Sequence, residues 1–331
     1  MVRSTSFFAA SHFPELTMPA DILVTAPLPD FLYGPLKADF RCHDYFQTTD
    51  KAGLLRQVAG SIHGLVQGGG TVTPTSLLDA LPALQIISVF GVGYDGVPVA
   101  YCKKRDIKVT NTPDVLTDDV ADVAVALILM TGRGFVRLNR FVHAGDWLKR
   151  SPELTTRLGG KTVGILGLGR IGKAIAQRVT AMGMEVAYTG RNPQEGPYRF
   201  ISDLKALAAA SDFLVVACPG GPATRNLVDA DVFAALGATG TIVNIARGSI
   251  IDESSMVKAL QDGTIKAAGL DVFVDEPNIP APLLEMKNVV LLPHVGSATH
   301  ETRKAMGDLC KANLDAWFAR KPLLTLIPEL G

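Results

Sequence analysis

Three polar residues in the second half of the chain could together carry acid–base chemistry. Arg247, Glu276 and His294 each follow a short apolar run. A guanidinium pairs well with a carboxylate ligand, and an unperturbed histidine titrates near about 6.5, which suits proton transfer at neutral pH. A carboxylate on the second ring nitrogen would fix the tautomer and favour the charged imidazole. A strand cap or surface ion pair, a turn acid and a structural histidine are the alternative interpretations.

A glycine motif precedes these residues. Gly167-Leu168-Gly169-Arg170-Ile171-Gly172 follows the apolar run Val163–Leu166 and opens a helical stretch. This strand–turn–helix context is the one in which such a motif binds a dinucleotide. The first glycine allows the tight turn, the second lets the pyrophosphate approach the backbone, and the third lets helix and strand pack. The N–H groups at the helix start would face the phosphates.

The end of the next strand indicates which dinucleotide binds. An acid about 20 residues after the motif would bind the ribose 2′-hydroxyl of NAD, but the sequence there is Gly190-Arg191-Asn192. Because a guanidinium can pair with a 2′-phosphate, we expect NADP(H) to be preferred over NAD(H). The alternative is that Arg191 is a solvated turn residue.

The surrounding elements predict an α/β fold. Short apolar runs alternate with helical stretches in two series, which indicates two Rossmann-like domains, each a doubly wound parallel sheet. The second series contains six expected strands: 162–166, 185–189, 213–217, 241–245, 267–272 and 289–292. A long helix is expected from Thr117, with Asp118 and Asp119 in its first turn.

Composition excludes several classes of function. The 32 basic and 32 acidic residues cancel, so no basic field attracts nucleic acid or an anionic membrane, and we expect neither partner. The four cysteines are far apart and join no histidine cluster, so we expect no metal site. Free thiols favour a cytoplasmic location. Residues 1–20 are expected to be a surface extension.

Together the motifs resemble the D-isomer-specific 2-hydroxyacid dehydrogenase family over nearly all of residues 60–305. The resemblance rests on the segments Ser88–Asp95 and Asn111–Asp119 and on the ordered set Arg247, Glu276 and His294. Within the family, Tyr188–Arg191 and Pro293–His300 are most similar to the NADP-dependent glyoxylate/hydroxypyruvate reductases. The resemblance implies reduction of a small 2-keto acid, such as glyoxylate or hydroxypyruvate, to the D-2-hydroxy acid with NADPH.

The resemblance also assigns roles. Arg247 would bind the substrate carboxylate and polarise the keto oxygen, His294 would protonate that oxygen, and Glu276 would hold His294. Asp271 matches the residue that binds the nicotinamide carboxamide. Further cofactor contacts are implied for Cys218, Pro219, Thr224, Ile245, Ala246 and Gly296. Substrate contacts are implied for Gly69, Gly70, Val92 and Gly93, in addition to Arg247 and His294.

The family resemblance implies a split chain as well. Residues 21–118 and 300–331 would form the substrate-binding domain, and residues 119–299 the dinucleotide-binding domain, with an active-site cleft between the two. A homodimer is expected through residues 117–150, where Trp147 either reaches the partner's active site or packs in an interface or core.

Three other functions stay open. The C-terminal-binding-protein corepressors resemble this fold but carry an acid suited to NAD at the position of Arg191. Formate dehydrogenases resemble it but carry Gln where Glu276 stands. Bulkier substrates, such as aryl pyruvates or sugar-derived keto acids, are also compatible with the glycine-rich loop at Gly69.

Overall fold

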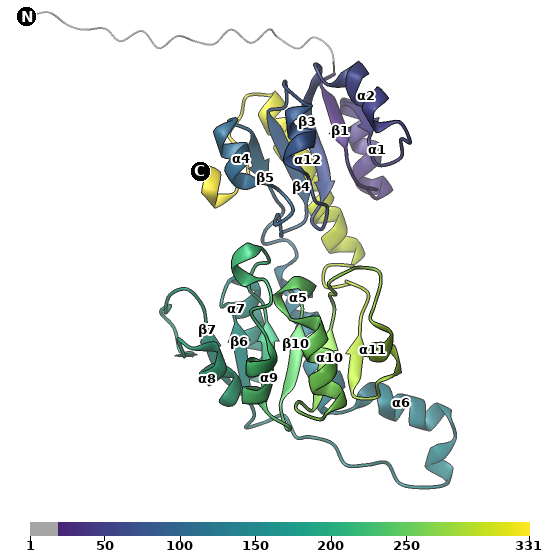
Figure 1. Ribbon diagram of the computed structural model, residues 1–331, viewed down its shortest axis with the longest axis vertical. Coiled ribbons are helices and arrows are strands. Elements are labelled where there is room, and N and C mark those ends of the chain that lie inside the picture. Colours follow the sequence, from purple (N-terminus) through teal and green to yellow (C-terminus); the bar gives the residue numbers. More distant parts are fainter. Residues whose placement is uncertain (1–18) are drawn as a thin grey trace, which may run out of the picture.

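The computed structural model describes residues 19–331 and consists of two α/β units stacked end to end (Figure 1). Each unit is built on a parallel sheet, of five strands in one unit and seven in the other. The expected extension falls almost wholly on residues 1–18, outside the described part of the chain.

The first sheet has the order β2-β1-β3-β4-β5, with every pairing parallel. Its strands are β1 (Asp21–Val24), β2 (Arg41–Asp44), β3 (Ile62–Gly68), β4 (Ile86–Phe90) and β5 (Lys108–Thr110). The connecting helices are α1 (Asp30–Asp39), α2 (Lys51–Val58), α3 (Thr75–Asp79) and α4 (Val99–Lys104). The central strands β1, β3 and β4 are the apolar ones, as expected for a sheet covered on both faces.

The last helix, α12 (His300–Phe318), returns to this first sheet and packs on β4 and α1. The hydroxyl of Ser88 on β4 donates to the carbonyl of Cys310 on α12 at 2.9 Å. Beyond the helix, Leu326 forms an antiparallel bridge with Thr110 on β5, and a final turn, η4 (Pro328–Leu330), follows. Residues distant in sequence therefore complete the first unit.

The second sheet has the order β12-β11-β10-β9-β6-β7-β8, also parallel throughout. Its strands are β6 (Thr162–Leu166), β7 (Glu185–Thr189), β8 (Arg199–Phe200), β9 (Phe213–Val216), β10 (Thr241–Asn244), β11 (Ala267–Leu270) and β12 (Val289–Leu291). The expectation of six strands was wrong by one, because β8 is a two-residue edge strand that carries no apolar run. The chain order reverses between β6 and β9, where open α/β sheets bind ligands.

Helices cover both faces of the second sheet. They are α5 (Thr117–Gly132), α7 (Arg170–Ala181), α8 (Leu204–Ala209), α9 (Ala230–Leu236), α10 (Glu253–Gln261) and α11 (Ala281–Glu285), with short turns η2 (Pro222–Thr224) and η3 (Gly248–Ile250). Helix α5 packs on α7, β10 and β11. A Cβ added to Gly269 of β11 would lie 3.0 Å from the Cβ of Leu127 on α5. The glycine therefore lets helix and strand approach closely. Arg178 of α7 pairs with Asp118 and Asp122 of α5 at 2.9 and 2.6 Å.

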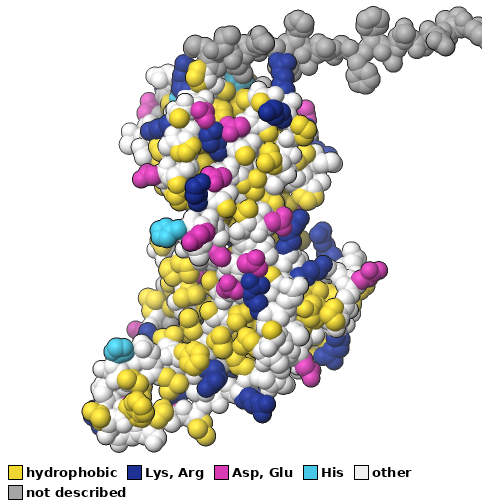
Figure 2. Space-filling model, turned by 180° about the vertical axis from the view of Figure 1, so that it is seen from behind, with side chains coloured by type: hydrophobic (Ala, Val, Ile, Leu, Met, Phe, Trp, Pro, Cys, Tyr) yellow, Lys and Arg dark blue, Asp and Glu magenta, His cyan; other side chains and the backbone are white. Residues whose placement is uncertain are grey.

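A projecting arm, residues 133–158, leaves the second unit after α5 (Figure 1). It contains α6 (Phe135–His143), no residue of which is buried, and the turn η1 (Asp146–Leu148). Three of its apolar side chains are largely exposed: Trp147 at 67%, Leu148 at 93% and Leu154 at 99%. Hydrophobic side chains gather over this arm at the lower left of Figure 2. Such an exposed apolar surface is typical of a protein–protein interface.

Residues 19–331 contain no candidate membrane span and no candidate metal-binding cluster. No helix there is both long and apolar enough to cross a membrane. Nor does that part of the chain gather three or more His, Cys, Asp or Glu side chains in a way that could hold a metal ion.

Candidate active site

The glycine turn lies between β6 and α7, and each of its glycines has a distinct physical role. Gly167 has φ +100°, and a Cβ there would lie 2.7 Å from the Cys218 backbone. A Cβ on Gly172 would overlap the carbonyl oxygen of Gly167. Gly169 is the N-cap of α7. A Cβ added there would meet nothing within 4 Å, and no side chain caps the helix start. The turn therefore offers uncapped N–H groups to a group approaching from outside, and it fits a dinucleotide pyrophosphate.

Neighbours on both sides hold this turn. Gln194 donates from Nε2 to the carbonyl of Leu168 at 2.8 Å, and the Ile171 side chain packs on the core. Arg170, at the first position of α7, pairs through Nε with Asp114 at 2.6 Å. Asp114 lies in the segment that joins the first unit to α5, so the glycine turn is connected to the crossing between the two units.

Gly190, Arg191 and Asn192 follow β7 and are all exposed. No hydrogen bond or ion pair joins the Arg191 guanidinium to another residue of the described range. It lies close enough to Tyr94 to act on it electrostatically: burial and the hydrogen bond to Glu329 raise the pKa of Tyr94 to about 12, and the charge of Arg191 partly opposes that rise. Arg191 thus presents available donors at the strand end where a ribose 2′-substituent is expected.

The loop after β9 forms the other wall of the turn. Cys218 is 9% exposed, and burial raises the pKa of its thiol to about 11, so it is protonated at neutral pH and suited to packing, not to nucleophilic attack. The loop closes where the Thr224 hydroxyl donates to the carbonyl of Pro219 at 2.8 Å.

Arg247 lies beyond the end of β10, and buried polar groups shape its turn. Asn244, at 1% exposure, donates from Nδ2 to the Arg247 carbonyl at 2.9 Å and accepts from the Ala246 N–H at 3.0 Å. Ile245 fills the core beneath. The Arg247 guanidinium reaches the first unit, where its Nε donates to Oδ1 of Asp95 at 3.1 Å.

His294 and Glu276 are in direct contact. Nδ1 of His294 lies 2.7 Å from Oε2 of Glu276, while Oε1 accepts from the Phe273 N–H at 3.0 Å. Burial alone would raise the pKa of Glu276, but the hydrogen bonds from His294 and Phe273, aided by the charges of His294 and Arg247, hold it below its ordinary value. Glu276 is therefore an ionised acceptor at neutral pH, and Nε2 of His294 is left for another partner.

Asp271 organises the backbone that carries His294. Its carboxylate is 1% exposed and accepts from the N–H groups of Val295 and Gly296, both at 2.8 Å. Its carbonyl accepts from the His294 N–H at 2.9 Å. His294 itself has φ +54°, a left-handed conformation that a non-glycine residue keeps only when its surroundings fix it. The carboxamide contact expected for Asp271 stays a prediction; the backbone contacts are an additional role.

The two glycine loops of the first unit lie side by side at the ends of β3 and β4. The N–H of Gly69 donates to the Phe90 carbonyl at 3.1 Å, so this donor is occupied, and the substrate contact expected at Gly69 stays a prediction. The N–H groups of Gly70, Val92 and Gly93 donate to no residue of the described chain. Asn111 donates from Nδ2 to the Val92 carbonyl at 2.8 Å. Because a trans peptide has its C=O and N–H on opposite sides, the Gly93 N–H points away from Asn111.

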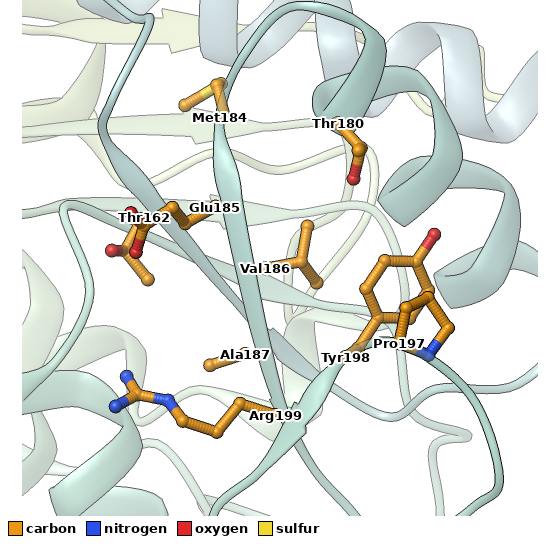
Figure 3. A pocket seen from close by; sticks show the side chains of 9 residues that line it. All are labelled: Thr162, Thr180, Met184, Glu185, Val186, Ala187, Pro197, Tyr198 and Arg199. Atoms are coloured by element: carbon orange, nitrogen blue, oxygen red, sulfur yellow. The ribbon is translucent and has the colours of Figure 1, made fainter.

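A cavity of about 460 Å³ occurs elsewhere, at the edge of the second sheet (Figure 3). Its lining includes the strand starts Thr162 and Glu185 and the edge residues Tyr198 and Arg199. None of its lining residues belongs to the expected site. The candidate site lies at the opposite, carboxyl ends of the strands.

Sequence reasoning missed three residues of this site. Asp95 and Asn111 stood in the quoted segments but received no role, and Asn244 was overlooked. For Asp95 the only signal was a carboxylate two residues after Gly93 of a glycine-rich turn. Its partner Arg247 is 152 positions away, and no local pattern reveals such a pairing.

Comparisons with known proteins agree with this architecture. Residues 125–296 match the model of the D-isomer specific 2-hydroxyacid dehydrogenase, NAD binding domain. The chain is 44% identical to glyoxylate/hydroxypyruvate reductase A HPR2 of Arabidopsis thaliana over 92% of this chain and 97% of that protein. It is 43% identical to hydroxyphenylpyruvate reductase of Plectranthus scutellarioides, with the same coverage.

Among solved structures, the chain is similar to an NADPH-dependent glyoxylate/hydroxypyruvate reductase from Sinorhizobium meliloti, crystallised with NADP and malonate. The TM-score is 0.88 at 42% identity, covering 95% of this chain and 98% of that one. With relatives this similar over their whole length, the chain belongs to the D-isomer specific 2-hydroxyacid dehydrogenase family.

Proposed function

We propose that this protein reduces a small 2-keto acid, such as glyoxylate or hydroxypyruvate, to the D-2-hydroxy acid with NADPH. The observation that carries the proposal is the 2.7 Å contact between His294 and Glu276, within electrostatic range of Arg247 and at the same strand ends as an open glycine turn. The relatives named above, glyoxylate/hydroxypyruvate reductases among them, support the substrate class.

The side chains divide the chemistry among them. When NADPH is bound at the glycine turn, its nicotinamide supplies the hydride for the keto carbon. Arg247 binds the substrate carboxylate and polarises the keto oxygen. His294 donates the Nε2 proton to that oxygen and becomes neutral, while Nδ1–H stays hydrogen-bonded to Glu276. Glu276 thereby fixes the tautomer and stabilises the charged imidazole before the transfer.

NADP(H) is the preferred cofactor in this proposal, because Arg191 and Asn192 stand where an NAD-specific acid would. A neighbour crystallised with NADP supports the preference. Arg191→Ala should lower kcat/KM with NADPH about tenfold and leave NADH use nearly unchanged, the loss expected for a charge-assisted hydrogen bond. An unchanged ratio between the two cofactors would remove Arg191 from this role.

Residues 21–118 with 300–331 act as the substrate-binding domain, and residues 119–299 as the dinucleotide-binding domain. The packing of α12 on β4 and of α5 on α7 supports these bounds. The keto acid then binds between the units, and closure would exclude water from it.

The working form is a cytoplasmic homodimer joined through residues 117–150. The exposed apolar side chains of the projecting arm support the dimer, since a second copy would cover them. Unpaired thiols at all four cysteines support the location.

Bulkier keto acids are the second candidate substrates. A hydroxyphenylpyruvate reductase is 43% identical to this chain, and a Cβ on Gly70 would meet nothing within 4 Å, which leaves space beside the expected carboxylate site.

The test is steady-state reduction of glyoxylate, hydroxypyruvate, phenylpyruvate and a 2-keto sugar acid, each with NADPH and with NADH. Highest kcat/KM for glyoxylate or hydroxypyruvate with NADPH supports the proposal. Highest values for phenylpyruvate or the sugar acid support the second candidate. Cofactor binding without turnover of any of them would favour a binding protein of the same fold.

A further inference from the structure

The Arg247 side chain lies between glycine loops of the two units. On the first unit, a Cβ at Gly93 would overlap Nη2 of Arg247. On the second unit, a Cβ at Gly220 would lie 2.7 Å from Cγ of Arg247. The two glycines therefore leave a narrow slot that the arginine fills, and its guanidinium has little freedom to move sideways.

Two acceptors then fix how the guanidinium is turned within this slot. Nε donates to Oδ1 of Asp95 at 3.1 Å, and Nη1 donates to the Ala246 carbonyl at 2.8 Å. Of the five N–H donors of an arginine, those that remain are on Nη1 and Nη2. Asp95 thus occupies the Nε side and leaves the Nη end for a ligand.

The pair is unlike most ion pairs of this protein. The side chains of Arg247 and Asp95 are only 22% and 26% exposed, whereas the helical pair Lys304–Asp308 is 65% and 59% exposed. Partial burial reduces screening by solvent. A contact of this kind can hold a side chain in one orientation, which exposed pairs rarely do.

Asp95 itself has little room to shift. It follows Gly93 and Tyr94 on the loop after β4, and a Cβ on Gly220 would lie 3.2 Å from its Oδ2. The neighbouring peptide at Val92 is fixed by Asn111. Both the donor and the acceptor of the pair are therefore placed by glycine-rich backbone.

We propose that Asp95 is a positioning residue for substrate recognition: it holds Arg247 so that only the Nη end, beside Gly93, meets the keto-acid carboxylate. The inference rests on the proposed function. A carboxylate can bind an arginine either across Nε and Nη2 or across the two Nη atoms. By occupying Nε, Asp95 removes the first mode, and the keto carbon is then presented in one orientation.

Two substitutions of Asp95 distinguish the position of its carboxylate from the charge of that group. Asp95→Asn keeps an oxygen acceptor at the same distance from the backbone but loses the charge. Asp95→Glu keeps the charge but adds a methylene that displaces the carboxylate from Nε. The matched controls are Asp308→Asn and Asp308→Glu on the exposed face of α12.

Each variant is measured for kcat and KM with the best keto acid and for the Kd of oxamate, a non-reducible keto-acid analogue, with NADPH present. We expect Asp95→Glu to raise both KM and the oxamate Kd about tenfold or more, as for a misplaced charge-assisted hydrogen bond. Asp95→Asn should stay within about threefold of wild type, because the amide oxygen still accepts from Nε–H. The Asp308 controls and the KM for NADPH should not change.

Three outcomes with an active wild type would overturn the inference. One is wild-type KM and oxamate affinity in both Asp95 variants. Another is a loss in Asp95→Asn at least as large as in Asp95→Glu, which would make the charge, not the geometry, decisive. The third is a change confined to the melting temperature, which would make the pair a simple link between the units. A wild type that neither reduces any keto acid nor binds oxamate would instead defeat the proposed function, and this inference with it.

Discussion

The loop around His294 and the projecting arm differ in how far their side chains are paired or packed within the chain. In the loop, Asp271 accepts from three backbone N–H groups through its side chain and carbonyl, and Glu276 accepts from the His294 ring. In the arm, α6 has no buried residue and apolar side chains face outward. The polar groups of the loop are therefore hydrogen-bonded within one chain, whereas the apolar side chains of the arm are exposed. A single chain can therefore hold the proton donor in place, but it leaves part of its surface to be covered.

The largest expected effect is at the completed loop. His294→Gln removes the proton donor while keeping a polar side chain of similar size. We expect kcat/KM for keto-acid reduction to fall about 10²- to 10⁴-fold, the usual contribution of a general acid. NADPH binding, measured by fluorescence titration, should change little. A rate near that of wild type would mean that the His294–Glu276 contact is structural.

The arm should respond through assembly. Leu148→Glu places a charge at a side chain that is 93% exposed in one chain. If a second copy covers this surface, the unpaired charge should weaken the dimer about 100-fold or more, which sedimentation at several protein concentrations would detect. Lys149→Glu, a neighbouring change with no apolar loss, serves as control. A monomeric wild type, or equal effects of both changes, would contradict the arm as interface.

Glu276→Gln tests the counter-charge in the loop. The amide keeps an acceptor beside His294 but cannot stabilise its charge, so we expect kcat/KM to fall about 10- to 100-fold. Because the Asp271 contacts remain, the melting temperature should change far less than the rate does.

The same variant gives a pH test of stability. Burial opposes ionisation of Glu276, yet its hydrogen bonds hold its folded pKa below the ordinary 4.5. The ionised carboxylate therefore stabilises the fold fully above pH 4.5 and loses that contribution as the pH falls through the lowered pKa. In urea unfolding, the stability advantage of wild type over Glu276→Gln should shrink as the pH falls from 4.5 through the lowered pKa. A constant difference across that range would contradict the lowered pKa.

Substitution of Trp147 should give the smallest change in activity, and it separates the two roles expected for this residue. If the ring reaches the partner's active site, Trp147→Ala should change the ratio of kcat/KM for hydroxypyruvate and glyoxylate by about three- to tenfold, a typical contribution of one apolar contact. If the ring only packs in the interface, the dimer weakens and this ratio stays constant. Measuring both quantities on the same preparation separates the two interpretations.

Apolar pattern and glycine chemistry made much of the fold predictable. The strands 162–166 and 185–189 begin and end as expected, because each is an apolar run closed by glycine. Strands β2, β5 and β8 were missed, and β5 has only three residues. Arg-Cys-His-Asp in β2 lacks an apolar run, and β8 has two residues at the sheet edge. Such strands form because a neighbouring strand offers free backbone groups, which sequence does not reveal.

The site was predictable where a motif fixes the local backbone and unpredictable where neighbouring strands or the two units meet. The contact of His294 with Glu276 was implied by the resemblance of these motifs to the dehydrogenase family. The occupied N–H of Gly69 depends on the carbonyl of Phe90 from a neighbouring strand, and the Asp95–Arg247 pair depends on how the units sit. These contacts are set by tertiary packing, so no pattern within one segment reports them.

The return of α12 to the first sheet has a consequence for how the protein matures on the ribosome. The seven-stranded unit, α5 to β12, is contiguous and can fold as soon as it leaves the exit tunnel. The five-stranded unit emerges earlier, yet it lacks the Cys310 carbonyl for Ser88 and the Leu326 bridge for Thr110 until synthesis reaches residue 326. The half made first is therefore completed last.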